Sequence, residues 1–188
     1  MQFYHIDKNG TLQTGQILSL IPFDKISNYP TNIDISRLNL LDGLSAFGVK
    51  YLCTPTSNKY DYHTYQIELV FELVRQLHFP NKPSRFQSIF CSKSFDELFA
   101  NWRELIVSSN ASKIVVLETE QNYSKHDANY LDLGAYKIDN HNAYSNLVAY
   151  ERAFHYWNGD ISSSPRLEYL VKLPVVVTET RPVIHSAF

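Results

Sequence analysis

The 188-residue sequence is poor in glycine, cysteine and methionine, with six, two and one of them respectively. It has no Gly-rich phosphate-binding loop, and the motifs GxSxG, HExxH and CxxC are absent. These absences argue against a P-loop domain, an α/β-hydrolase and the common zinc sites. The chemistry of the protein must therefore be sought in residues that are far apart in the sequence.

The sequence also lacks the features of secreted, membrane-bound and broadly basic proteins. Cys53 and Cys91 stand far apart without metal-type spacing, which predicts free thiols in a reducing compartment, and we expect a cytoplasmic location. Residues 1–10 are too polar for a signal peptide, and the longest apolar run, residues 173–177, is too short to span a membrane. The net charge of −2 includes no polybasic stripe, so a general nucleic-acid-binding surface is not indicated, although an enzyme acting on nucleic acid needs only a local basic patch.

Aromatic residues are abundant, with 13 Tyr and 11 Phe. Such side chains favour strands and line pockets that hold flat ligands, although most of them are expected in the core. A chain of this length with 44% hydrophobic residues can bury a core without disulfides or metal. We therefore expect one compact domain over residues 1–188.

Hydrophobic periodicity and capping signals predict three helices. Apolar residues at every third or fourth position indicate a helix over 64–77. Ser94 and Glu97 form a capping box for a second helix, and Gly159 follows a third over 145–157. We expect strands at 3–6, 16–21, 86–91, 113–117, 129–133, 168–171 and 175–180. This order favours an α+β fold with mostly antiparallel strands and helices packed beside them.

Two arrangements of polar residues offer alternatives for a site. A metal site would require a loop to bring together four residues that are near in sequence: His126, Asp127, Asp139 and His141. Glu118 or Glu120, which follow a predicted buried strand, would form with Glu168 an acid pair suited to a glycosidase.

The strongest pattern is spread over the whole chain. His5 lies on the first predicted strand, directly after the aromatic residues Phe3 and Tyr4. The segment 83–94, PSRFQSIFCSKS, is a predicted strand flanked by hydroxyl side chains that leads into the second helix. Glu168 opens a late strand of sequence EYLV, and a carboxylate at the head of an apolar strand is expected at a sheet edge or in a cleft.

This pattern resembles the ADP-ribosyltransferase superfamily, in particular its diphtheria-toxin-like branch, which includes the poly-ADP-ribose polymerases. Members of that branch have a His on the first strand, a mid-chain strand that leads into a Ser-rich helix start, and a Glu that opens a late strand. Here His5, the segment 88–94 and Glu168 occur in the same order. The phrases DGLS at 42–45 and YWNG at 156–159 are also similar to those of an uncharacterised bacterial family that we associate with this fold.

The resemblance implies split antiparallel sheets with flanking helices around an NAD cleft between the two sheets. It implies Glu168 as the catalytic carboxylate, which binds the ribose 2′-hydroxyl and stabilises the positive charge that develops as the nicotinamide–ribose bond breaks. It places His5 on the adenosine ribose and Phe90 against the nicotinamide ring. The other residues expected to contact NAD are Tyr4, Arg85, Ser88 and Ser92, with Arg85 suited to the pyrophosphate.

The expected function is that of an NAD-dependent mono-ADP-ribosyltransferase that modifies a protein or a nucleic acid and requires no metal. Such a protein would be a toxin, an anti-phage effector or a modifier of host molecules, with an antitoxin or immunity protein as partner. Phe90 stands where the superfamily often has Tyr, so the hydroxyl is missing. This difference leaves two alternatives, which are a non-catalytic interaction or nucleic-acid-binding module of the same fold and an NAD glycohydrolase.

Each candidate residue also has a purely structural interpretation. His5 would be a half-buried strand residue, Ser88 and Ser92 would face solvent, Arg85 would pair with Asp96 or Glu97, and Glu168 would be an exposed strand-end residue.

Overall fold

The computed structural model describes residues 1–27, 38–40, 42–55, 59–107, 111–132, 136–138, 141–143 and 145–183. A four-stranded antiparallel sheet has the order β1 (Gln2–Asp7), β4 (Lys113–Glu118), β9 (Val175–Pro182) and β2 (Ile17–Leu18). A three-stranded antiparallel sheet has the order β3 (Ser88–Cys91), β8 (Leu167–Lys172) and β5 (Tyr123–Asp127). The strands β6 (Tyr136–Ile138) and β7 (His141–Ala143) form a separate antiparallel pair.

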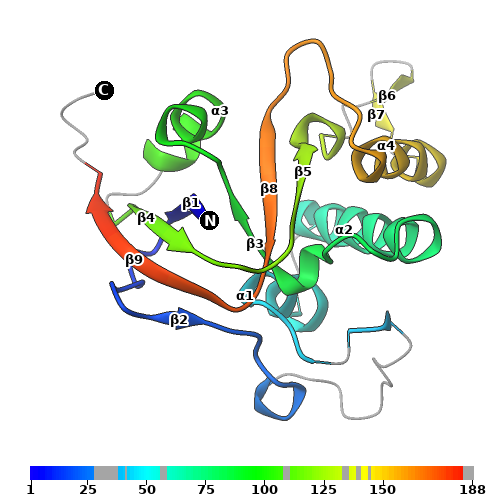
Figure 1. Cartoon of the computed structure of the whole chain (residues 1–188). Helices are drawn as coiled ribbons and strands as arrows, with labels where there is room; N and C mark the ends of the chain where they lie inside the picture. Colours follow the sequence, from blue (N-terminus) through cyan, green and yellow to red (C-terminus); the bar gives the residue numbers. More distant parts are fainter. Residues whose placement is uncertain are drawn as a thin grey trace.

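Helices lie beside these sheets, as an α+β fold requires (Figure 1). The long helices are α2 (Lys59–His78), α3 (Phe95–Val107) and α4 (Asn146–Asn158). The short helix α1 (Ala46–Gly48) continues directly into the π-helical segment Val49–Cys53. Single 3₁₀ turns cover Phe23–Lys25, Arg85–Gln87 and Ala128–Tyr130. The expected α+β class with antiparallel sheets is confirmed.

The two larger sheets are joined at two places. The edge strands β1 and β3 meet through a single bridge, in which the backbone N–H groups of Tyr4 and Ser92 each donate to the other residue's carbonyl. The chain also runs from β8 of one sheet directly into β9 of the other, through Leu173 and Pro174 (Figure 1). The inner faces of the two sheets therefore face each other.

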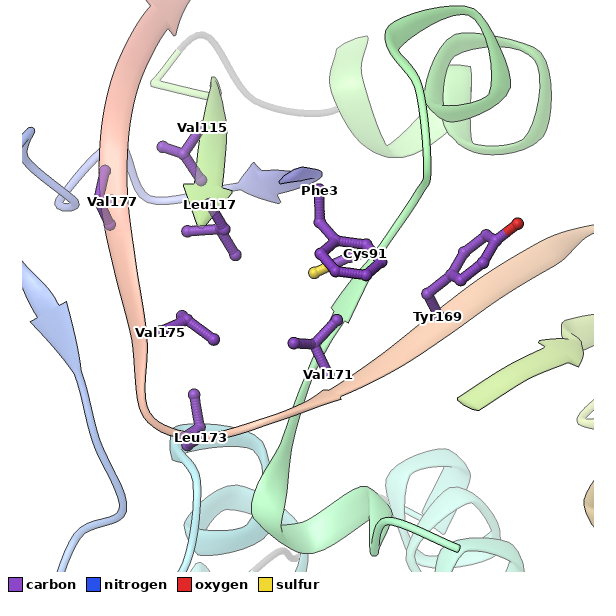
Figure 2. Packing of buried hydrophobic residues seen from close by; sticks show 9 residues of the cluster. All are labelled: Phe3, Cys91, Val115, Leu117, Tyr169, Val171, Leu173, Val175 and Val177. Atoms are coloured by element: carbon purple, nitrogen blue, oxygen red, sulfur yellow. The ribbon is translucent and has the colours of Figure 1, made fainter. Parts of the chain in front are cut away.

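Apolar side chains fill the space between these inner faces. Phe3 and Leu117 come from one sheet and Tyr169 and Val171 from the other, and all four lie in one buried cluster with Cys91 (Figure 2). Adjacent strand residues point to opposite faces. Residues 168 and 170 of β8 therefore point away from this cluster. The expectation of a cleft between the two sheets is wrong, because that space is part of the core.

The outer faces are covered by the long helices. Leu170 of β8 packs with Phe71 of α2 and Trp157 of α4 in a second buried cluster. Ile114 of β4 packs with Leu98 of α3 in another. α2 and α4 lie against the face of the second sheet that is turned away from the first sheet (Figure 1). α3 lies beside β1, near the place where β1 and β3 meet, and its Trp102 donates a hydrogen bond to the Leu167 carbonyl of β8. The outer face of the second sheet and the helices above it hold the residues discussed below.

Local signals in the sequence predicted the start of α3 and both ends of α4, whereas α2 begins at Lys59 and not at the expected residue 64. The Ser94 side chain accepts a hydrogen bond from the Glu97 N–H at 3.1 Å, which confirms the N-terminal cap of α3. Gly159 ends α4 in the left-handed region with φ of 87°, and its N–H donates to the carbonyls of His155 and Tyr156. A glycine adopts this backbone conformation without the steric penalty of a Cβ.

Three predicted strands differ from the observed ones. The strand expected over 129–133 is wrong, because β5 ends at Asp127, whose carboxylate accepts the Asn129 N–H at 3.0 Å and starts a 3₁₀ turn. The strand expected over 16–21 is reduced to Ile17–Leu18. The strand expected over 86–91 begins only at Ser88, because residues 85–87 form a 3₁₀ turn.

Candidate functional site: a buried Arg85–Glu168 network

The 3₁₀ turn before β3 directs Arg85 into the space between α2, α4 and the second sheet. The turn is capped by Ser84, whose Oγ accepts the Phe86 N–H at 3.1 Å and donates to the Glu72 carboxylate of α2 at 2.8 Å. Arg85 is 3% exposed. A charged side chain so deeply buried requires charged partners and a complete set of hydrogen bonds.

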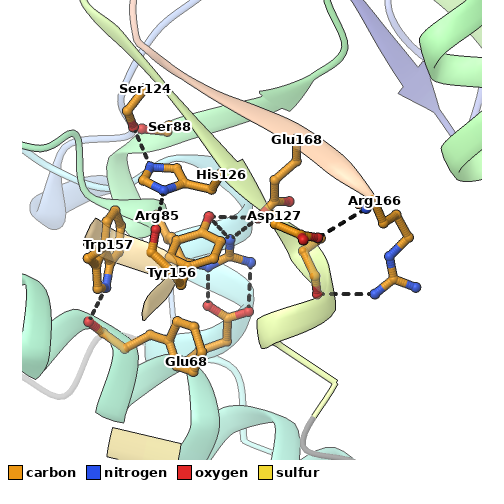
Figure 3. Close-up of polar contacts among 12 residues, drawn as sticks. Glu68, Arg85, Ser88, Ser124, His126, Asp127, Tyr156, Trp157, Arg166 and Glu168 are labelled. Atoms are coloured by element: carbon orange, nitrogen blue, oxygen red, sulfur yellow. Dashed lines mark hydrogen bonds and ion pairs between the residues drawn. The ribbon is translucent and has the colours of Figure 1, made fainter. Parts of the chain in front are cut away.

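Two carboxylates and a phenol surround the Arg85 guanidinium (Figure 3). Glu68 of α2 accepts two hydrogen bonds from it, from Nε at 2.7 Å and from Nη2 at 3.0 Å. Nη1 lies 2.6 Å from Oε1 of Glu168 on β8 and 2.6 Å from the hydroxyl of Tyr156 on α4. The Tyr156 hydroxyl also lies 2.6 Å from Oε1 of Glu168.

The charges of this network do not cancel. Burial by itself lowers the pKa of Arg85, but Glu68, Tyr156 and Glu168 together raise it well above its ordinary value, so the guanidinium stays charged. Burial holds the pKa of Tyr156 well above its ordinary value, so the phenol stays neutral. By formal charges, the two carboxylates and the one guanidinium give the network a net charge of −1. In the described parts of the chain, no second Lys or Arg forms an ion pair with either carboxylate.

The two oxygens of Glu168 have different surroundings. Both hydrogen bonds to this carboxylate are made to Oε1, from Arg85 and Tyr156. The second oxygen, Oε2, has no hydrogen-bond partner among the residues that the structure describes. The whole residue is 4% exposed. The protein therefore fixes one oxygen of a buried carboxylate and leaves the other for a further donor.

A histidine supports the network from the neighbouring strand. His126 of β5 lies opposite Glu168 in the sheet and is completely buried. Its ring stacks on the Tyr156 ring with centroids 4.2 Å apart, and its Nδ1 lies 2.7 Å from the Tyr156 carbonyl oxygen. Nε2 lies 2.7 Å from the Ser124 hydroxyl. Burial lowers the pKa of His126 to about 3, so this imidazole is neutral near pH 7.

Aromatic rings border the guanidinium on the remaining sides. Its central carbon lies 4.6 Å from the centroid of Phe90, 5.3 Å from that of Tyr156 and 5.6 Å from that of Phe47. Phe47 and Phe90 are half-buried and contact each other edge to face, with centroids 4.4 Å apart. The predicted site residues Arg85, Phe90 and Glu168 are thus brought together on one face of the second sheet.

His5 is connected to this group indirectly. Its Nδ1 lies 2.7 Å from the carbonyl oxygen of Phe90, at the point where β1 and β3 separate. Strand alternation places His5 on the same side of β1 as Phe3, which belongs to the cluster between the sheets. Burial lowers the pKa of His5. His5 therefore contacts the backbone of β3, and its side chain does not share the face that holds Glu168.

The predicted serines are both buried, so their interpretation as solvent-facing residues is wrong. Ser88 is 1% exposed and donates its hydroxyl to the Ser84 carbonyl at 2.7 Å. Ser92 is fully buried, and its hydroxyl has no hydrogen-bond partner. Because Cys91 pairs with Tyr169, the next residues in the antiparallel register place Ser92 opposite Glu168. Tyr4 contacts Ser92 through the backbone bridge.

Arg85 does not have the partners expected from the sequence. It pairs with Glu68 and Glu168, so the expected structural pairing with Asp96 or Glu97 is wrong. All three of its nitrogens are engaged with these carboxylates or with Tyr156, and the side chain is buried. This geometry directs Arg85 toward Glu168, whereas the prediction placed it on the pyrophosphate of NAD.

Sequence reasoning did not identify Glu68, Tyr156 or His126 as members of the site. Glu68 carried one usable signal, because it follows Ile67 on a helix whose apolar face includes Phe71. An acidic residue next to an apolar helical stripe is a candidate for a buried charge. No sequence spacing indicates that Tyr156 of α4 meets a carboxylate of β8.

The two alternative sites do not form in the described structure. Within the described ranges, no group of three or more His, Cys, Asp or Glu residues is placed to hold a metal ion, and Asp139 lies outside those ranges. Glu118, at the end of β4 in the other sheet, and Glu120 are both exposed. The second carboxylate of the network is instead Glu68. Cys53 and Cys91 are free and buried. No helix of the described chain has the length and apolar character needed to cross a membrane.

A comparison with known protein families identifies the family of this chain. A family described as a protein of unknown function, DUF2441, matches residues 3–182. The chain belongs to the DUF2441 family. The matched range of this DUF2441 protein contains every residue of the Arg85–Glu168 network and also His5. The comparison with curated proteins gave no match.

Proposed function

We propose that this DUF2441 protein is an NAD-dependent mono-ADP-ribosyltransferase in which Glu168 is the catalytic residue. One observation carries the proposal. The Glu168 carboxylate is buried in a network of net charge −1, one of its oxygens is fixed, and the other has no partner in the described structure. Such a carboxylate is prepared to accept a hydrogen bond from a ligand and to stabilise positive charge.

The reaction develops positive charge at the position where such a carboxylate acts. The C1′–N bond of the nicotinamide ribose breaks, its electron pair leaves with nicotinamide, and the ribose passes through an oxocarbenium-like state. In the proposed complex, Oε2 of Glu168 accepts the ribose 2′-hydroxyl proton in a hydrogen bond. A nucleophile of the acceptor then forms the new bond to C1′, and its proton passes to the solvent. The negative charge of the network lowers the barrier because the positive charge moves from the nicotinamide ring to the ribose, where it lies closer to Glu168 than in the ground state.

Other residues of the same face fit this assignment. The half-buried Phe90 ring offers a surface for the nicotinamide ring, and its lack of a hydroxyl does not affect stacking. The buried hydroxyl of Ser92, opposite Glu168, has no hydrogen-bond partner in the described structure, and in this proposal it bonds a polar group of the ligand. In this assignment Arg85 holds the Glu168 carboxylate in place. His5 fixes the backbone of β3 through its hydrogen bond to the Phe90 carbonyl.

The acceptor in this proposal is a macromolecule, either a protein or a nucleic acid. An enzyme of this kind would act as a toxin, an anti-phage effector or a modifier of host molecules. A protein that modifies components of its own cell requires restraint, so an antitoxin or immunity protein is the expected partner. The near-neutral net charge of −2 favours a protein acceptor over bulk nucleic acid.

The test uses NAD labelled in its adenylate part, incubated with the purified protein and a cell lysate. We expect labelled macromolecules with the wild type, and protease or nuclease treatment then identifies the acceptor class. Glu168→Gln keeps the shape and the oxygen that Arg85 and Tyr156 bind, so it should fold normally and lose turnover. Glu118→Gln, on an exposed strand end, is the matched control and should keep full activity. Full turnover by Glu168→Gln would overturn the assignment.

A non-catalytic module of the same fold is the second candidate, and one observation favours it. Glu168 is only 4% exposed and bonded to Arg85, as in a structural ion pair. This candidate predicts that NAD produces no thermal shift and that no nicotinamide is released with any acceptor. An NAD glycohydrolase would instead release free ADP-ribose from NAD in buffer alone, which distinguishes hydrolysis from transfer.

A further inference from the structure

We infer that Tyr156 is a positioning residue that sets the orientation of the Glu168 carboxylate, and that His126 fixes Tyr156 in place. The inference rests on the proposed function, because it assigns these residues to the site that binds NAD. It adds two residues that the sequence pattern did not include. The argument depends on which groups can donate a proton at each contact.

The direction of the hydrogen bonds at Tyr156 follows from its neighbours. Its hydroxyl lies 2.6 Å from Nη1 of Arg85 and 2.6 Å from Oε1 of Glu168. A guanidinium can only donate, so the phenol oxygen accepts from Arg85. The single phenolic proton is then left for the carboxylate, and Tyr156 donates it to Oε1. The elevated pKa of Tyr156 is consistent with a phenol that keeps this proton throughout the working pH range.

The same reasoning fixes the tautomer of His126. The Tyr156 carbonyl can only accept, so Nδ1 of His126 carries the proton and donates it across 2.7 Å. Nε2 is therefore unprotonated and accepts the Ser124 hydroxyl proton across 2.7 Å. Tyr156 is thus held at its backbone by a hydrogen bond and at its ring by stacking on the same imidazole.

This arrangement explains why only one carboxylate oxygen of Glu168 is engaged. Arg85 and Tyr156 approach Oε1 from two different elements, the turn before β3 and helix α4. Two donors on one oxygen define the plane of the carboxylate better than a single ion pair does, and they leave Oε2 for the ligand. Without the phenol, Arg85 alone holds Glu168, and the carboxylate can rotate about its last side-chain bond.

The test compares Tyr156→Phe with Tyr150→Phe. Both changes remove one hydroxyl from α4, but the Tyr150 hydroxyl bonds His78 on the exposed outer side of the helix. We expect Tyr156→Phe to lower kcat for nicotinamide release roughly 10- to 100-fold, which corresponds to one hydrogen bond to a charged group. KM for NAD should change less than about twofold, and the acidic limb of the pH–rate profile should move to higher pH. Tyr150→Phe should match the wild type in kcat, in KM for NAD and in its pH–rate profile.

A second variant covers the case in which Tyr156→Phe does not fold. Ser124→Ala removes only the far hydrogen bond to His126 and should lower kcat by a smaller factor with the same KM. If Tyr156→Phe, or Ser124→Ala in its place, behaves like Tyr150→Phe while the wild type is active, the positioning role is wrong. If the wild type itself releases no nicotinamide, the proposed function fails, and the inference fails with it.

Discussion

Replacing Arg85 by an uncharged residue is expected to lower the stability of the protein strongly. In Arg85→Met the apolar side chain has a similar length, so packing against Phe47 and Phe90 is largely retained. The positive charge that pairs with Glu68 and Glu168 is lost, and both carboxylates stay in a site where they are 5% and 4% exposed. The perturbation therefore tests electrostatics more than packing.

The size of the expected stability loss follows from the burial of the two carboxylates. Removing one partner of a buried ion pair costs about 3–5 kcal/mol, because the remaining charge stays desolvated. Arg85 serves two carboxylates, so we expect at least that loss in the free energy of unfolding. A domain has roughly 5–15 kcal/mol in total. For a chain of this length the loss corresponds to a decrease in Tm of roughly 6–20 °C.

Urea unfolding followed by tryptophan fluorescence measures this loss directly. Arg181→Met is the matched control, because Arg181 pairs with Glu179 at 2.7 Å while both side chains are about half exposed. Exposed pairs of this kind contribute little to stability. The double variant Arg85→Met/Glu68→Gln removes one of the two unpaired charges and should regain part of the loss. Arg85→Met should also regain stability as the pH falls, since protonation removes the unpaired charges. A loss no larger than that of Arg181→Met would refute the reasoning.

Two further changes test the surroundings of the site. His126 has a pKa of about 3 in the folded protein because it is buried, against 6.5 in the unfolded chain, so the unfolded state gains a proton first as the pH falls. The neutral imidazole therefore makes its full contribution to the free energy of unfolding above pH 6.5. This contribution decreases between pH 6.5 and 3, and at pH 5 it is lower by about 2 kcal/mol. The stability difference between the wild type and His126→Gln should shrink by this amount from pH 7 to 5, and a pH-independent difference would contradict it. In Gly48→Ala, the new Cβ would lie 2.2 Å from the Phe86 carbonyl oxygen, so we expect a loss of about 3 kcal/mol or more in urea unfolding. Gly159→Ala, where nothing lies within 4 Å, should lose only the backbone term of about 1–2 kcal/mol, and equal losses would argue against a steric effect at Gly48.

The helices and most strands could be predicted because their signals are local. The apolar stripe of α2 and the Ser94 cap of α3 depend on residues within a few positions of one another. β5 (Tyr123–Asp127) was not predicted, and a strand was expected over 129–133 instead, because the contacts that end β5 are partly long-range. Asp127 looks like part of a loop in the sequence, but its carboxylate accepts N–H groups from Asn129, Ser162 and Arg166, which are 2 to 39 residues away. The long-range bonds cannot be read from local composition.

The candidate site was predictable only in part. Glu168 was identified because it opens an apolar strand, as does the Glu of the ADP-ribosyltransferase superfamily that the sequence resembles. Its two hydrogen-bond partners come from the turn before β3 and from α4, and the residues that hold those partners come from α2 and β5. Arg85 was selected for its match to phosphate, but the structure gives it carboxylates. Which anion an arginine meets depends on which side chains the fold brings to it.

By itself, the sequence determined an α+β chain with three amphipathic helices and short antiparallel strands, and it singled out His5, Phe90 and Glu168. Periodicity and capping suffice for the helices and strands, because they act over one turn of a helix or one pair of strand residues. The three site residues were selected through the resemblance to the ADP-ribosyltransferase superfamily. Only the tertiary structure decided that apolar side chains fill the space between the sheets. It placed His5 on the side of β1 that faces this space, whereas Glu168 points away from it. It also decided that Glu168 is held by Arg85 and Tyr156, because burial and electrostatic balance depend on segments up to 83 residues apart.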